Sequence, residues 1–180
     1  AYDFIEKPFN IDQLTVVIAR AMETSRLRSE NAAFKVREIP SFELIGNSSV
    51  FKNFKQQLEK VSSGNSRIML SGSSGAGKEV AARYIHKNSP RKDFAFITVN
   101  SASMSSERME ELLFGSEVNG KVHMGLLEKA NGGILYLDEV GDMPIGTQSK
   151  ILRILVDQQF MRIGGNTNVS VDFRVISSSS

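Results

Sequence analysis

Hydrophobic residues along the chain follow two patterns, one typical of buried strands and one typical of helices. Short apolar runs bounded by turn residues predict strands that are buried on both faces of a sheet, at residues 67–70, 94–99, 134–137 and 171–176. Segments with helical spacing or helix-forming composition lie between these runs, at residues 80–86, 107–113 and 142–155. This alternation predicts an α/β fold, in which a mostly parallel sheet lies between two layers of helices.

Two further apolar stripes with helical spacing precede the first predicted strand. The first predicts a helix that begins at Asn10, and its stripe consists of Ile11, Leu14, Val17, Ile18 and Ala21. The second predicts a helix that faces the core, and its stripe consists of Val50, Phe51, Phe54, Leu58 and Val61. Charged residues dominate from Met22 to Pro40, which indicates a solvated helical connector. This connector either joins two copies into a dimer or is merely exposed.

Composition narrows the class of protein. The chain has 180 residues, of which 41% are hydrophobic and 23% charged, with a net charge of +2 and no cysteine. These values are ordinary for a globular protein and give no argument for a nucleic-acid or membrane partner. We expect a cytoplasmic protein, because the sequence shows no signal peptide and no apolar run of membrane length. The chain opens in the middle of a pattern and stops after a strand-like run, so we expect a piece of a longer protein.

The strongest motif lies between the first predicted strand and the helix that follows it. Residues 71–79 read Ser-Gly-Ser-Ser-Gly-Ala-Gly-Lys-Glu, which contains the Gly-x-x-x-x-Gly-Lys core of a phosphate-binding P-loop. Glycines let backbone N–H groups point inward at a helix N-terminus, where anions bind, and Lys78 adds a point charge for the terminal phosphates. The candidate nucleotide-binding residues are Gly72, Ser73, Ser74, Gly75, Ala76, Gly77, Lys78, Glu79 and Val80.

Glu79 stands where a P-loop usually carries the serine or threonine that holds Mg²⁺. A carboxylate can also hold this metal, directly or through water, so ATP or ADP with Mg²⁺ is the expected cofactor. The alternative interpretation is a plain glycine- and serine-rich turn between a strand and a helix.

The second motif follows the apolar run at 134–137, where Asp138 and Glu139 stand in succession. They mark the carboxyl end of a buried strand, where ligands bind in open α/β sheets. This is a Walker B arrangement, in which Asp138 holds Mg²⁺, usually through water, and Glu139 orients or deprotonates the attacking water. The alternative is a strand whose acidic end caps the next helix.

From residue 44 to the end, the chain resembles the ATPase domain of the sigma-54-dependent activators, the NtrC family. The likeness is carried, in order, by Leu44-Ile45-Gly46, the P-loop, Val99-Asn100, Leu113-Phe114-Gly115, the strand that ends in Asp138-Glu139, and Arg162-Ile163-Gly164-Gly165. The resemblance implies a three-layer αβα AAA+ core over residues 43–180. It also implies that Ile45 and Gly46 pack on the adenine ring, and that Asn100 holds Glu139 away from water in one nucleotide state.

Residues 1–27 resemble the end of a response-regulator receiver domain, with a helical linker at 28–42. Lys7 matches the receiver lysine that contacts the phosphorylated aspartate. Together the two parts resemble NtrX-type response regulators of two-component systems. That resemblance implies a sensor histidine kinase, RNA polymerase and a second copy of the chain as partners, and promoter DNA bound through a C-terminal domain.

Two departures from the family affect the expected function. The Gly-Ala-Phe-Thr-Gly-Ala loop that grips sigma-54 is absent from residues 116–125, so a sigma-54 contact is doubtful, and Ser180 stands at the position of a sensor asparagine. The family's arginine fingers and helical lid are expected beyond residue 180, so hydrolysis is expected to be weak and enzymatic activity stays open. The leading hypothesis is an ATP-binding regulator of transcription. The alternatives are a sigma-54 activator that remodels RNA polymerase by ATP hydrolysis and, more remotely, an unrelated P-loop kinase.

Overall fold

The computed structural model describes residues 43–101, 105–118 and 120–180. The chain divides into two compact units, Ala1–Ser41 and Phe42–Ser180, and the described residues belong to the second. The predictions for Lys7, for the helix that begins at Asn10 and for the linker at 28–42 lie outside the described residues and stay predictions.

Four parallel strands form the central sheet, in the order β1-β8-β5-β2. They are β1 (Ile68–Ser71), β2 (Phe96–Asn100), β5 (Ile134–Asp138) and β8 (Arg174–Ser179). In the register, Ser71 lies opposite Ser179 and Asn100 lies opposite Asp138. The carboxyl ends of all four strands therefore meet at one edge of the sheet, where ligands bind in folds of this class.

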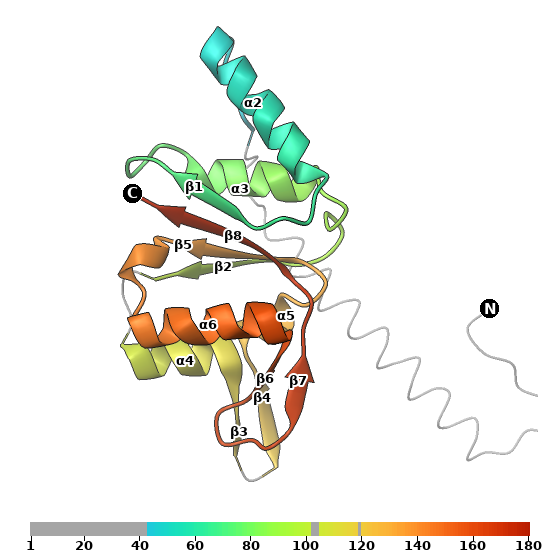
Figure 1. The fold of residues 1–180 in the computed structure, drawn as a ribbon, viewed down its shortest axis with the longest axis vertical. Coiled ribbons are helices and arrows are strands. Elements are labelled where there is room, and N and C mark those ends of the chain that lie inside the picture. Colours follow the sequence, from blue (N-terminus) through green and yellow to red (C-terminus); the bar gives the residue numbers. More distant parts are fainter. Residues whose placement is uncertain (1–42, 102–104, 119) are drawn as a thin grey trace, which may run out of the picture. The chain divides into compact units, whose positions relative to one another are not determined.

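Helices cover both faces of the sheet, which confirms the predicted three-layer α/β architecture (Figure 1). On one side lie α2 (Ser49–Ser62) and α3 (Lys78–Lys87), which pack on each other. On the other side α4 (Ser106–Phe114) packs against α5 (Leu126–Lys129) and α6 (Ile145–Asp157). A short 3₁₀ helix, η1 (Val140–Asp142), follows β5 directly. Among the described residues, no helix combines the length and the apolar character needed to cross a membrane.

The central strand β5 is apolar throughout because both of its faces are covered. Ile134 and Tyr136 belong to the apolar cluster on the α3 side, whereas Leu135 and Leu137 belong to the cluster on the α4 and α6 side. Side chains alternate between the faces of a strand, so a strand between two helical layers needs apolar residues at every position. This arrangement fixes β5 firmly and leaves Asp138, at its end, to face the edge of the sheet.

Two hairpins extend from the α4 and α6 side of the sheet (Figure 1). They consist of β3 (Gly115–Val118) with β4 (Lys121–Met124), and β6 (Gln159–Met161) with β7 (Asn168–Ser170). Arg162 joins them to α5, because its guanidinium contacts Glu128 at 2.7 Å and Glu117 at 3.4 Å. Apolar residues on a strand are expected to face a core, but Val118, Val122 and Met124 on the first hairpin are exposed.

Two other expectations need correction. The stripe on α2 is not a core stripe, since Leu58 is 3% exposed but Val50 is 77% exposed, because α2 reaches beyond the sheet and only part of it is covered (Figure 1). The last strand begins later than predicted, at Arg174, and continues through Ser179. Its serines face the ends of neighbouring strands, where polar partners are available.

Candidate nucleotide-binding site

The predicted P-loop connects β1 to α3 and has the backbone conformation that an anion site requires. Gly75 and Gly77 have φ values of 78° and 83°, in the left-handed region. A Cβ atom at either position would meet nothing within 4 Å, so the backbone angle, rather than lack of room, demands glycine. Gly77 is the N-cap of α3, and Lys78 begins the helix. The loop therefore ends at a helix N-terminus, where N–H groups and the helix dipole favour phosphate.

Lys78 lies inside the loop, with its side chain only 9% exposed. Its Nζ atom donates to the carbonyl oxygen of Gly72 at 2.7 Å and lies 2.9 Å from Oε1 of Glu139. The lysine of the first motif and the second carboxylate of the Walker B motif are thus in direct contact. This contact brings the two motifs together in space, although they lie far apart in the sequence.

Glu139 has a strained backbone conformation, and three polar contacts hold its side chain. Its φ of 50° is left-handed, which is uncommon for a residue with a side chain. Lys78 contacts Oε1, while the N–H and the hydroxyl of Ser180 donate to Oε2 at 2.8 and 3.0 Å. The hydrogen bond from Lys78, helped by those from Ser180, lowers the pKa of this carboxyl. Glu139 is consequently ionised at neutral pH.

Asp138 is fixed through one of its two oxygens. The hydroxyls of Ser178 and Tyr136 both donate to Oδ1, at 2.6 and 2.9 Å. A carboxylate held in this way, at the end of a central strand, suits Mg²⁺, which usually binds one or two carboxylates and completes its shell with water and phosphate. Within the described ranges, no group of three or more His, Cys, Asp or Glu side chains gathers as a self-sufficient metal site.

Two further predicted site residues, Asn100 and Glu79, lie at the ends of neighbouring elements. Asn100 ends β2 beside Asp138. Glu79 lies in the first turn of α3, where Oε1 accepts two hydrogen bonds from Arg83, at 2.7 and 2.9 Å. If Glu79 also held the metal, the charge of its carboxylate would be divided between the metal and Arg83. The roles of Asn100 and Glu79 stay predictions.

The predicted adenine contact lies before α2. Ile45 is 85% exposed, whereas a Cβ atom on Gly46 would lie 2.7 Å from the ring of Phe51. Packing of Phe51 thus supplies one physical reason for glycine at this position. Contact of Ile45 and Gly46 with a base stays a prediction.

Two residues of the site were not identified from the sequence. Tyr136 reads as one more apolar residue of a buried strand, and Ser178 reads as part of the polar end of another. Their signal lies in the topology, since β8 runs between β1 and β5 and must end between the two motifs. Polar residues at the end of the strand between a P-loop and a Walker B motif would have indicated them.

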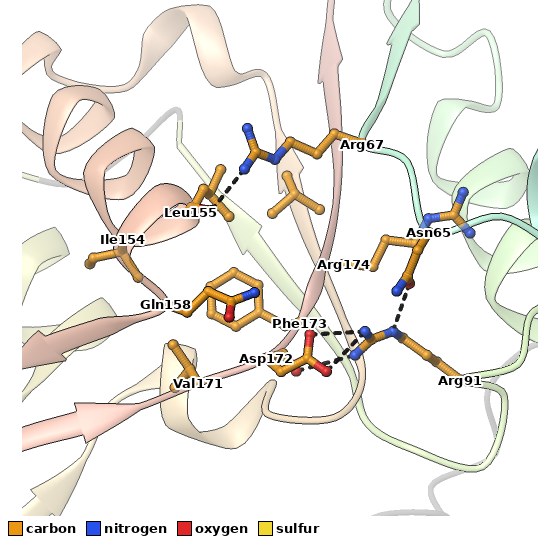
Figure 2. Close-up of a pocket in the computed structure, with 11 residues that line it drawn as sticks. Asn65, Arg67, Arg91, Ile154, Leu155, Gln158, Val171, Asp172, Phe173 and Arg174 are labelled. Carbon is orange, nitrogen blue, oxygen red and sulfur yellow. Dashed lines mark hydrogen bonds and ion pairs between the residues drawn. The ribbon is translucent and has the colours of Figure 1, made fainter.

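A cavity of about 150 Å³ lies away from the P-loop, near the amino end of β8 (Figure 2). Three arginines line it, but the cavity is not an evident anion site. Figure 2 shows Arg91 facing Asp172, with both carboxylate oxygens within 3.1 Å of Nη2, and Arg67 facing the backbone of Leu155. Arg174 donates to three backbone carbonyls around the end of α2. These arginines join α2, α6 and β8, so the cavity is part of a structural junction.

Comparison with known proteins agrees with this geometry. The sequence model of the sigma-54 interaction domain matches residues 44–180. The chain is 48% identical over 180 residues to the nitrogen assimilation regulatory protein NtrX of Azorhizobium caulinodans, covering 99% of this chain and 39% of that protein. The chain thus spans about two-fifths of the length of such relatives.

Solved structures show the same likeness. NtrX from Brucella abortus is 53% identical, and its crystal structures in complex with ADP and with ATP have TM-scores of 0.75 and 0.73, covering all of this chain and 41% of that one. The P-loop NTPase domain of the sigma-54 transport activator from E. coli shares the fold, with a TM-score of 0.50 and 20% identity over 75% of this chain and 78% of that one. The chain therefore belongs to the sigma-54 interaction domain family, as a member of its NtrC/NtrX type.

Proposed function

We propose that the described unit binds ATP and ADP with Mg²⁺ and acts as the nucleotide-controlled module of an NtrX-like response regulator. The observation that carries this proposal is the contact at 2.9 Å between Lys78 of the P-loop and Glu139 of the Walker B motif. Support also comes from the NtrX of Brucella abortus, which was crystallised with ADP and with ATP.

Each part of the site has a separate task in binding. The N–H groups of the loop between Gly72 and Gly77 surround the phosphates, and Lys78 supplies the positive charge. The metal, when bound, neutralises phosphate charge, and Asp138 is the carboxylate placed to hold it, with Glu79 as a second candidate. Glu139 is the group that orients water, and Asn100 is its proposed partner in one nucleotide state.

Hydrolysis is a weaker expectation than binding. A general base works best when its pKa is near the working pH, whereas the pKa of Glu139 is lowered by its contacts with Lys78 and Ser180. Arginine fingers from a neighbouring molecule are worth about 10³–10⁵ in rate in related NTPases. We therefore propose slow turnover by this chain, with the nucleotide acting as a switch of assembly.

The function of the whole protein extends this proposal. A sensor histidine kinase phosphorylates the receiver domain, of which residues 1–27 are the end, and Lys7 reads that phosphorylation. Phosphorylation and ATP together set a homo-oligomeric state in the cytoplasm, and a C-terminal domain binds promoter DNA to regulate transcription by RNA polymerase. These steps rest on the family likeness alone.

The test of nucleotide binding is Lys78→Ala in titration calorimetry with ATP and Mg²⁺. We expect the variant to weaken binding by about 2–4 kcal/mol, because a charge-assisted hydrogen bond to phosphate in a partly buried site has a free energy of this scale. Lys150→Ala is the matched control. Lys150 lies on α6, is exposed, and pairs with Glu110 of α4 rather than with a residue of the P-loop or the Walker B motif. Equal affinities for the wild type and Lys78→Ala would refute the proposal.

A sigma-54 activator that remodels RNA polymerase is the second candidate function. The hairpin β3–β4 favours it, because Val118, Val122 and Met124 are exposed there and offer an apolar contact without a Phe-Thr pair. The discriminating measurement is binding of sigma-54 to the full-length protein with an ATP transition-state analogue. A stable complex that needs the analogue would favour the activator over the switch. The family membership leaves no support for an unrelated small-molecule kinase.

A further inference from the structure

Ser178 is a fully buried residue whose hydroxyl lies between the two carboxylate residues of the site. Its Oγ accepts a hydrogen bond from the backbone N–H of Glu139 at 3.0 Å and donates to Oδ1 of Asp138 at 2.6 Å. The direction of both bonds is fixed, because a backbone N–H can only donate and an ionised carboxylate can only accept. One side chain on β8 thus connects both residues of the Walker B motif.

Tyr136 is the second donor to Asp138 and lies two positions before it on β5. Its hydroxyl is 2.9 Å from Oδ1, and its ring is fully buried beside Phe96. A phenol keeps its proton at neutral pH, because its ordinary pKa is about 10. The tyrosine is therefore a permanent donor to the carboxylate.

The two donors act on the same oxygen, and this determines what Asp138 can do. Oδ1 has two hydroxyl partners, so a metal approaching from outside the strand meets Oδ2. The N–H bond to Ser178 also fixes the backbone of Glu139 at its left-handed φ, a conformation that needs local support in a residue with a side chain. Loss of the Ser178 hydroxyl would therefore loosen both carboxylate residues at once.

We propose that Ser178 and Tyr136 are positioning residues of the nucleotide site, which aim Oδ2 of Asp138 at the metal that accompanies ATP. The inference rests on the proposed function, since it concerns how that site couples metal to nucleotide. Groups that hold a metal ligand in place commonly contribute a factor of about 10–100 to metal affinity. The factor by which Mg²⁺ strengthens ATP binding should therefore depend on these two hydroxyls.

The experiment compares ATP affinity in Mg²⁺ and in EDTA for the intact chain and three variants. In Ser178→Ala we expect the ratio of the affinity in Mg²⁺ to the affinity in EDTA to fall by about tenfold or more. Tyr136→Phe removes one donor and keeps the ring, so the same change in smaller measure is expected. Ser177→Ala is the matched control, because its hydroxyl bonds to Ile68 on β1 rather than to either carboxylate, and its ratio should stay unchanged.

The outcomes separate this inference from the proposed function. If the wild type binds ATP with a Mg²⁺ effect that both variants keep, positioning is wrong and nucleotide binding stands. If Ser178→Ala and Tyr136→Phe lose affinity equally in Mg²⁺ and EDTA, the hydroxyls have a general structural role and the inference is wrong. If the wild type binds no ATP, the proposed function fails and the inference falls with it. Thermal unfolding without ligand identifies a variant that fails to fold, and Tyr136→Phe then decides alone.

Discussion

Lys78 and Glu139 neutralise each other at the place where a phosphate would bind. The ammonium has the carboxylate at 2.9 Å and the loop carbonyl of Gly72 at 2.7 Å, so its charge is already compensated in this structure. On the proposed function, a nucleotide competes with Glu139 for the same cation. The exchange would then free the carboxylate of Glu139 as the γ-phosphate arrives, when Glu139 is proposed to orient water.

A second residue, His86, gives the free energy of unfolding a predictable dependence on pH. Its Nε2 lies 3.1 Å from the carbonyl oxygen of Arg91 and 3.0 Å from that of Phe94. Burial lowers the pKa of His86 in spite of these carbonyls. In the unfolded chain, the His86 imidazole has its ordinary pKa of about 6.5, so it binds a proton at a higher pH than it does in the folded chain.

We therefore expect the free energy of unfolding to decrease as the pH falls from about 7 through 6.5 toward the lower pKa of the folded state. Urea titrations at several pH values measure this slope, and His86→Gln should flatten it. His123→Gln, which removes the chain's other histidine, shows whether the slope belongs to His86. A slope that His86→Gln leaves unchanged would contradict the assignment.

At the scale of elements, β8 is fastened at both ends. Ser178 near its end donates to Asp138, and Ser180 just beyond it donates to Glu139. Arg174 at its start donates to the carbonyls of Val61, Ser62 and Ser66, at 2.6, 3.2 and 2.9 Å. Burial and the nearby Arg91 lower the pKa of Arg174, whose donors nevertheless satisfy the end of α2. This side chain ties the end of α2 to the start of β8, beside the apolar contacts of Leu58.

Arg174→Met should accordingly lower the free energy of unfolding by about 2–4 kcal/mol, because the carbonyls at the end of α2 lose their donor. Denaturant unfolding measures the loss, and hydrogen exchange should show faster exchange in α2. Arg153→Met is the control, since Arg153 is exposed on α6 and pairs with Asp157 at the surface, so its effect should stay within about 0.5 kcal/mol. Equal effects of the two substitutions would show that the buried donors contribute little.

The sequence predicted the elements with strong local signals and missed those that depend on packing. The runs around β1 and β5 and the glycines at 75 and 77 predicted the sheet and the loop, because chain geometry alone demands those residue types. The hairpins were missed, since β4 has only four residues and is exposed at every position, so its alternation of polar and apolar residues marks no buried face. Helical spacing on α2 correctly indicated a helix, but spacing cannot tell whether another element covers the stripe.

The site divides in the same way. Lys78, Asp138 and Glu139 could be predicted because their motifs have fixed spacing relative to a strand and a loop. Ser178 and Tyr136 could not, because the partner of a hydroxyl depends on which strands become neighbours. That neighbourhood, with β8 between β1 and β5, is a property of the tertiary fold.

At the scale of the molecule, the site exists only when the whole sheet is formed. Its residues come from the ends of β1, β5 and β8, which are distant in sequence and adjacent in the sheet. A ligand that binds only the folded chain stabilises it by about 2.7 kcal/mol at one hundred times its Kd. Nucleotide binding should therefore be visible as global stabilisation.

We expect ATP with Mg²⁺ to raise the Tm of the Phe42–Ser180 unit in a concentration-dependent way, with added hydrogen-exchange protection in β5 and β8. Scanning calorimetry over a series of ATP concentrations measures the shift, and Lys78→Ala should lose most of it. A Tm that does not move at saturating ATP would count against a site built across the sheet.

The strand order has a last consequence, for the colloidal behaviour of the chain. Among the described strands, β1 is an edge strand that pairs with β8 alone, and Met69 on this strand is exposed. Open edges of this kind recruit strands from other molecules. The rate of aggregation should therefore rise more steeply than the protein concentration, since the edges of two molecules must meet. A charged residue in place of Met69 should slow this aggregation.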